Sequence, residues 1–106
     1  MTLAQIQDST TPLQTARVGA ACEDVKTLHY VFDCLQRCFA GDYGEVQPED
    51  AETNNKEVAT GEGRILARYK ARHKLEEEIY IICYFSASMP AVVDANYTMV
   101  MYRSEY

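Results

Sequence analysis

The chain has 106 residues, a formal net charge of −6 and 47% hydrophobic residues, which is ordinary for one globular domain with a modest core. No apolar run approaches the roughly 18 to 20 residues of a membrane span. The acidic total disfavours general nucleic-acid binding, because that activity requires neutralising phosphates. The polar segment 1–13 lacks the basic and apolar regions of a secretory signal, so we expect a cytoplasmic protein with no membrane partner.

The sequence of the N-terminal half predicts a flexible segment followed by one main helix. Residues 1–13 are expected to be a flexible arm, ahead of a single domain over 14–106. A short edge strand is predicted over 14–18. A helix is predicted over 23–39, since apolar residues recur there at three- and four-residue spacing, and Gly41 suits its end. The apolar stripe consists of Val25, Leu28, Val31, Phe32, Leu35, Cys38 and Phe39.

A tight turn and a second helix follow. In residues 41–45 two glycines surround Asp42 and Tyr43, which predicts a turn that holds the tyrosine ring against a neighbouring element. Proline and acidic residues at 48–50 are typical of a helix start, so a second helix is expected to run to about Thr60. Because this helix has few apolar residues, we expect it to cover a sheet edge or to stay largely solvated.

The C-terminal half predicts strands. Residues 64–72 alternate apolar and charged side chains, and residues 76–85 are rich in β-branched and aromatic ones, which indicates a β-hairpin with a turn near Lys74. The expected cross-strand pairs are Tyr69–Ile79, Ala67–Ile81, Ile65–Cys83, Lys70–Glu78 and Arg72–Glu76. A loop over 86–96 and a third strand over 97–102 complete the chain. The expected fold is α+β, an antiparallel three- or four-stranded sheet packed on the 23–39 helix.

Four cysteines stand at 22, 34, 38 and 83 without a Cys-x2-Cys pair, so we expect buried core thiols rather than disulfides or catalytic groups. Cys34 and Cys38 are one helical turn apart and could ligate zinc with His29, His73 or Cys83. A structural zinc site normally has a second close pair, which the chain lacks. No metal or cofactor is therefore expected.

Charged residues are unevenly distributed along the chain. Residues 41–62 hold seven acids and one base, so this segment alone accounts for the net charge of −6. Eight tyrosines are more than a small core can bury, because each buried hydroxyl needs a hydrogen-bond partner. Some should therefore lie on the surface, where tyrosine is enriched in protein interfaces. We predict that this segment binds a basic protein surface. The predicted partner-binding residues are Asp42, Tyr43, Glu45, Glu49, Asp50, Glu52 and Glu57.

The basic residues of 64–72 permit a different hypothesis. With Tyr69 and Tyr80 they resemble the aromatic and basic platforms that bind single-stranded nucleic acid. The acids of 76–78 would lie opposite them in the hairpin, so we favour cross-strand ion pairing and no direct nucleic-acid contact. Whether this basic stripe is free or paired stays open at this point.

From Arg37 onward the chain resembles a family of small, functionally uncharacterised bacterial proteins carried by plasmids, phages and other mobile elements. The matching residues are Arg37, Gly41-Asp42-Tyr43-Gly44-Glu45, Glu49-Asp50, Asn54, Arg64-Ile65-Leu66-Ala67-Arg68-Tyr69, Ile79-Tyr80-Ile81-Ile82, Thr98 and Glu105-Tyr106. Cys38, Tyr43, Cys83 and Arg103 replace a His, Trp, Thr and Pro of the family pattern, so any acid–base or metal role of that His is lost. The resemblance implies a mobile-element setting and an α+β fold, and no reaction.

These observations predict a non-enzymatic protein-binding factor, an anti-CRISPR-like inhibitor of a bacterial defence nuclease. Its acidic side chains would occupy a basic nucleic-acid channel of the target. One alternative is a homodimeric or larger accessory protein, paired through an exposed strand edge. Another is a small metal-dependent hydrolase or nuclease that uses Asp42 with His29 or His73.

Overall fold

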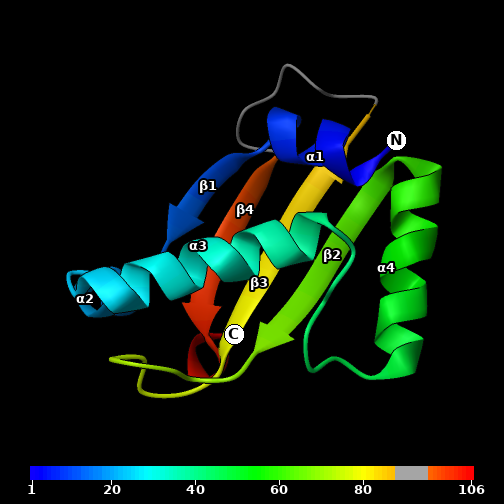
Figure 1. Cartoon of the computed structure of the whole chain (residues 1–106). Helices are drawn as coiled ribbons and strands as arrows, with labels where there is room; N and C mark the ends of the chain where they lie inside the picture. The colour runs from blue at the N-terminus through cyan, green and yellow to red at the C-terminus, as the bar shows by residue number, and fades with distance from the viewer. Residues whose placement is uncertain (88–95) are drawn as a thin grey trace.

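The computed structural model describes residues 1–87 and 96–106, which form an α+β fold around a four-stranded sheet (Figure 1). The strands are β1 (Thr11–Gln14), β2 (Glu62–Tyr69), β3 (Ile79–Ser86) and β4 (Tyr97–Tyr102), in the order β1-β4-β3-β2. β2, β3 and β4 are antiparallel and β1 is parallel to β4. The predicted α+β class is confirmed, with a mixed sheet. The loop predicted over 86–96 lies largely outside the described residues.

The hairpin has the predicted register but a wider loop. Tyr69 pairs with Ile79, and the two other predicted apolar pairs also form. The ladder stops there, so the expected ion pairs of Lys70 with Glu78 and of Arg72 with Glu76 are wrong. The loop opens because Leu75 is buried in the core and the Lys74 N–H donates to Thr27 Oγ1 at 3.0 Å. A buried apolar anchor outweighs two exposed ion pairs, each worth less than about 1 kcal/mol.

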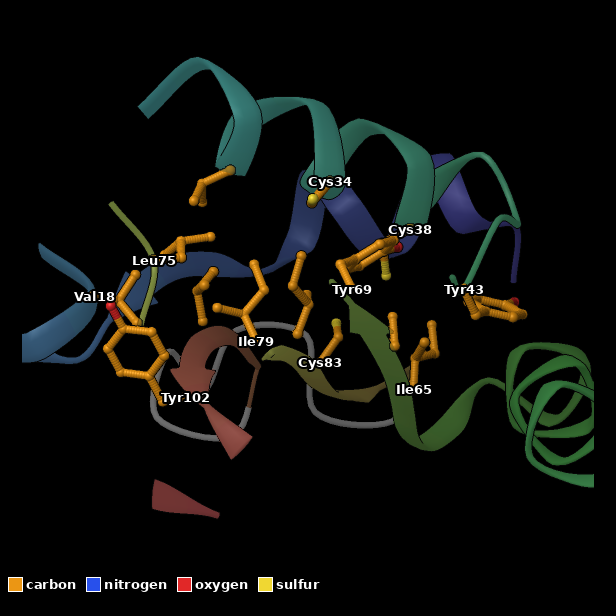
Figure 2. Packing of buried hydrophobic residues seen from close by; sticks show 14 of the residues in the cluster. Val18, Cys34, Cys38, Tyr43, Ile65, Tyr69, Leu75, Ile79, Cys83 and Tyr102 are labelled. Atoms are coloured by element: carbon orange, nitrogen blue, oxygen red, sulfur yellow. The ribbon is translucent and has the colours of Figure 1, made fainter. Parts of the chain in front are cut away.

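The main helix, α3 (Val25–Phe39), lies across one face of the sheet (Figure 1). The Asp24 carboxylate accepts the Thr27 N–H at 3.0 Å and caps the helix start. Figure 2 shows Cys34 and Cys38 directed from α3 toward the sheet core, where Tyr69 and the buried residues of β3 lie. The predicted apolar stripe is only partly buried, as described below.

The N-terminal segment differs from the predicted flexible arm. Residues 1–13 contain α1 (Leu3–Ser9) and most of β1, and Ile6 is fully buried in the core. Thr2 and Gln5 form a capping box that starts α1. The predicted N-terminal edge strand exists, but its bounds of 14–18 are wrong, since β1 ends at Gln14 and α2 (Ala16–Ala21) follows, capped by the Thr15 side chain.

The second helix, α4 (Pro48–Thr60), lies beside β2 and covers that edge of the sheet, as predicted (Figure 1). Asn54 is 3% exposed, and its amide bonds both backbone groups of Leu66, accepting from the N–H at 3.0 Å and donating to the C=O at 2.8 Å. The helix ends at Gly61, whose φ of 81° is left-handed.

The opposite edge, β1, is also a poor template for another strand. The Thr11 N–H donates to Asn96 O, just before β4, at 3.3 Å, and the Thr15 N–H donates to Val100 O of β4 at 3.1 Å. Backbone groups alternate along a strand, so Pro12 and Gln14 face away from β4. Pro12 has no N–H that could bond a further strand, so the free edge of β1 pairs poorly with another chain.

Candidate functional site

The acids predicted to bind a partner lie on α4 and on the loop before it, at the β2 edge (Figure 1). Glu49 and Asp50 occupy the first turn of α4, where negative side chains favour the positive end of the helix dipole. Glu52 follows on the exposed side, with Lys56 Nζ 3.6 Å from its carboxylate. All three acids are exposed, and so is Glu45 in the loop. We call Glu45, Glu49, Asp50 and Glu52 the acidic face.

Asp42 belongs to the turn rather than to this face. Its Oδ2 accepts from Arg37 Nε at 2.7 Å, and its Oδ1 accepts the Gly44 N–H at 3.1 Å. The Arg37 guanidinium, followed by the Gly44 amide, holds the pKa of Asp42 below its ordinary value. The Tyr69 hydroxyl donates to the Asp42 carbonyl oxygen at 2.7 Å. The side chain and the backbone of Asp42 therefore both hold the turn.

Tyr43 and Glu57 are less exposed than the other residues predicted to bind a partner. Tyr43 is 4% exposed and its hydroxyl donates to Asn55 Oδ1 at 3.0 Å, so the turn holds the ring against α4 as expected. Glu57 is half-buried, and its carboxylate lies against Gly63, where a Cβ would overlap it.

A basic loop joins β2 to β3, and its Lys70 Nζ lies 4.0 Å from the carboxylate of Glu45 in the acidic face. Lys70, Arg72 and Lys74 in this loop are exposed, and the Arg72 guanidinium lies 5.4 Å from the Tyr30 ring centroid. The acids that follow pair with other elements, in the contacts Glu76–Arg17, Glu77–Arg17, Glu78–Arg68 and Glu78–Arg103. The bases in this loop are therefore not neutralised by the hairpin's own acids.

The outer sheet face carries aromatic side chains. Tyr84 and Tyr97 are neighbours across β3 and β4, with ring centroids 5.0 Å apart. Tyr106 packs edge-on against Tyr80 at 5.3 Å and accepts a hydrogen bond from Arg64. The surplus tyrosines thus lie largely on this outer face and not beside the acidic residues of α4. Two bases on this face are already engaged, Arg64 with the Tyr106 hydroxyl and Arg68 with Glu78.

The cysteines are buried free thiols, as predicted. Burial raises the pKa of Cys34 to about 11 and that of Cys38 to about 12. Burial also raises the pKa of Cys22 and Cys83. These thiols are therefore protonated at neutral pH, and a thiol is a weak nucleophile in that state.

Sequence reasoning missed an apolar groove between α3 and the β1 edge. One part has a volume of about 200 Å³, with Leu28, Phe32 and Leu35 on one wall and Pro12 and Leu13 on the other. A second part of about 170 Å³ continues toward Phe39. Phe32 is 55% exposed and Leu13 is 45% exposed. The signal in the sequence was the width of the apolar stripe, which exceeds what one sheet can cover.

No protein-family model, curated protein or solved structure matches the chain. Among residues 1–87 and 96–106, no helix has the length and apolar character that a membrane span requires. In the same part of the chain, no three His, Cys, Asp or Glu side chains gather where they could hold a metal ion.

Proposed function

We propose that this chain is a non-enzymatic protein-binding factor of a mobile element that inhibits a bacterial defence nuclease in the cytoplasm, as anti-CRISPR proteins do. The acidic face would dock on a basic protein surface, such as a nucleic-acid channel of the target. The observation that carries the proposal is the exposure of Glu49, Asp50 and Glu52 on one helix at the edge of the molecule.

Two further features support this role. α4 is anchored by the buried Asn54, so its acids are presented on a positioned element rather than on a free chain. The one base on the helix, Lys56, approaches Glu52 alone and leaves the first turn negative. Clustered charge of one sign steers a complementary partner and raises the rate of association.

The test is capture of partners from the bacterial host on the immobilised chain, followed by a cleavage assay with the nuclease that binds. We expect the unmodified chain to hold the nuclease and to slow its cleavage. The variant Glu49→Lys/Glu52→Lys should lose at least tenfold in affinity, since it reverses two contacts worth up to about 1 kcal/mol each. Binding of the unmodified chain should also weaken as salt increases.

The control is Asp8→Lys/Glu23→Lys, which changes the net charge equally at two exposed positions away from α4. This control should bind the nuclease nearly as well as the unmodified chain. If both double variants bind equally at low and high salt, the acidic face is not the docking surface. If no nuclease binds and none is slowed, the inhibitor proposal is wrong.

A further inference from the structure

α3 presents an apolar surface to solvent. Val25 is 61% exposed and Phe32 is 55% exposed, and Leu13 of β1 borders the same groove. In the described part of the chain, the other large apolar side chain with comparable exposure is Tyr106. Large apolar groups gathered on one surface mark an interaction site more often than a chance exposure.

The exposed residues of α3 repeat after seven positions. Val25 and Phe32 lie two turns apart on one side of the helix, and Lys26 and Asp33 lie beside them at the same spacing. Lys26 and Asp33 are both exposed, and the described residues contain no ion pair of either side chain. Each end of this face therefore has one large apolar group and one charge, and the two charges have opposite sign.

We propose that α3 is the interface of a homodimer in which two copies of the helix pack antiparallel about a two-fold axis near His29. In this arrangement Val25 of each copy contacts Phe32 of the other, and Lys26 faces Asp33 of the other copy. A two-fold interface must be complementary to itself, and this face meets that requirement in the placement of its apolar groups and its charges.

The groove beside the helix adds room for such contacts. Its part of about 200 Å³ lies along Leu28 and Leu35, on the flank of α3 opposite Lys26 and Asp33. An apolar cavity of about 150 Å³ holds a benzene molecule, so this groove can accept an apolar side chain of the second copy. The two flanks of the helix would then make different contacts with the second copy, one apolar and one between charges.

Charge favours a second copy as the occupant. The exposed face of α3 carries one base and one acid, so it is neutral, whereas the acidic face lies on α4 across the sheet from β1 (Figure 1). Pairing through α3 keeps the two acidic helices apart and avoids repulsion between them. This dimer is independent of the proposed nuclease binding, and it replaces pairing through a strand edge, since Pro12 and Asn54 close the two edges.

The first test is the mass in solution, measured by sedimentation equilibrium over a range of concentrations. We expect the mass to rise with concentration from the 12.0 kDa of one chain toward twice that value. Phe32→Asp should stay at 12.0 kDa, and because Phe32 is more than half exposed the variant should keep the native circular dichroism spectrum. Ala59→Asp, which adds the same charge on the exposed side of α4, should dimerise normally.

The second test exchanges the charges. Lys26→Asp should weaken dimerisation about tenfold, since it creates two like-charge contacts per dimer. Asp33→Lys should weaken it similarly, and the double variant Lys26→Asp/Asp33→Lys should restore the affinity of the unmodified chain. A chain that is monomeric at all concentrations overturns the proposal, and so does a double variant that dimerises no better than the single ones.

Discussion

Gly44 occupies a position where the fold leaves no room for a side chain. Its φ is 72°, and a Cβ there would overlap the Arg68 carbonyl oxygen and meet the Tyr69 ring. The close approach allows the backbone of residues 43–45 to bond β2, with Glu45 N–H to Arg68 O at 2.7 Å. Gly41 has a similar φ of 91°, but its nearest neighbour would be Leu3 Cδ1 at 3.8 Å.

These two glycines allow a matched test of backbone strain against steric overlap. Gly41→Ala should cost about 1 to 2 kcal/mol of unfolding free energy, the cost of a left-handed conformation alone. Gly44→Ala should cost about 3 kcal/mol or more, because the bonds to Arg68 must also break. Urea denaturation of both variants measures the difference, and equal losses would mean that the turn can move away from β2.

At the same scale, several polar residues hold the fold together. Arg37 pairs with Asp42, Tyr69 bonds the Asp42 carbonyl, and Asn54 bonds Leu66. Glu105 accepts from the Tyr102 N–H at 2.9 Å and from the Thr15 hydroxyl at 2.9 Å. These residue types could be recognised in the sequence as special, but their roles required knowledge of the neighbours that the fold supplies.

At the scale of elements, α4 depends on β2 for its place. The helix buries little apolar surface, so the two bonds of Asn54 to Leu66 are a large share of what holds it. Asn54→Ala leaves two backbone groups without partners and should cost about 2 to 4 kcal/mol in the free energy of unfolding. Chemical denaturation monitored by circular dichroism gives this value.

The adjacent exposed position supplies the control for that measurement. Thr53→Ala should change the stability by no more than about 0.5 kcal/mol, because its hydroxyl bonds only the Glu49 carbonyl on the helix surface. Similar stabilities of the two variants would indicate that water replaces the Asn54 amide and that α4 is held by other contacts.

Elements with strong local signals were predictable. The bounds of α4 followed from Pro48 and Gly61, and the hairpin register followed from the alternation in β2. The loop over 70–78 could not be predicted, because its course depends on the burial of Leu75 in a core that other elements form. The bonds of Lys74 to Thr27 and of Glu76 to Arg17 join residues far apart in the sequence, which no local pattern reveals.

At the scale of the whole molecule, two surfaces of different chemistry lie on different elements. The acidic face was foreseeable from the charge count of residues 41–62, although Tyr43 is buried, Glu57 is half-buried, and the exposed Asp42 also holds the turn. The exposed side of α3 was not predicted: the width of the apolar stripe signals that some of it stays uncovered, but periodicity does not say which side chains these are.

The N-terminal segment decides whether the sheet is complete. Without β1, β4 would become an open edge, and without α1 the core would lose Ile6, which is fully buried. Ile6→Ala should therefore cost about 2 to 5 kcal/mol in unfolding free energy, as other buried truncations do. Denaturant unfolding at low protein concentration measures this cost without a contribution from self-association.

The comparison variant is Asp8→Ala, in the same helix but exposed, which should change the stability by no more than about 0.5 kcal/mol. The two variants separate the ordered segment from the flexible arm that composition predicts. A loose arm would make Ile6→Ala as harmless as Asp8→Ala, because a side chain that is solvated in both states has no burial to lose. A large loss for Ile6→Ala alone requires that α1 packs on the core in solution.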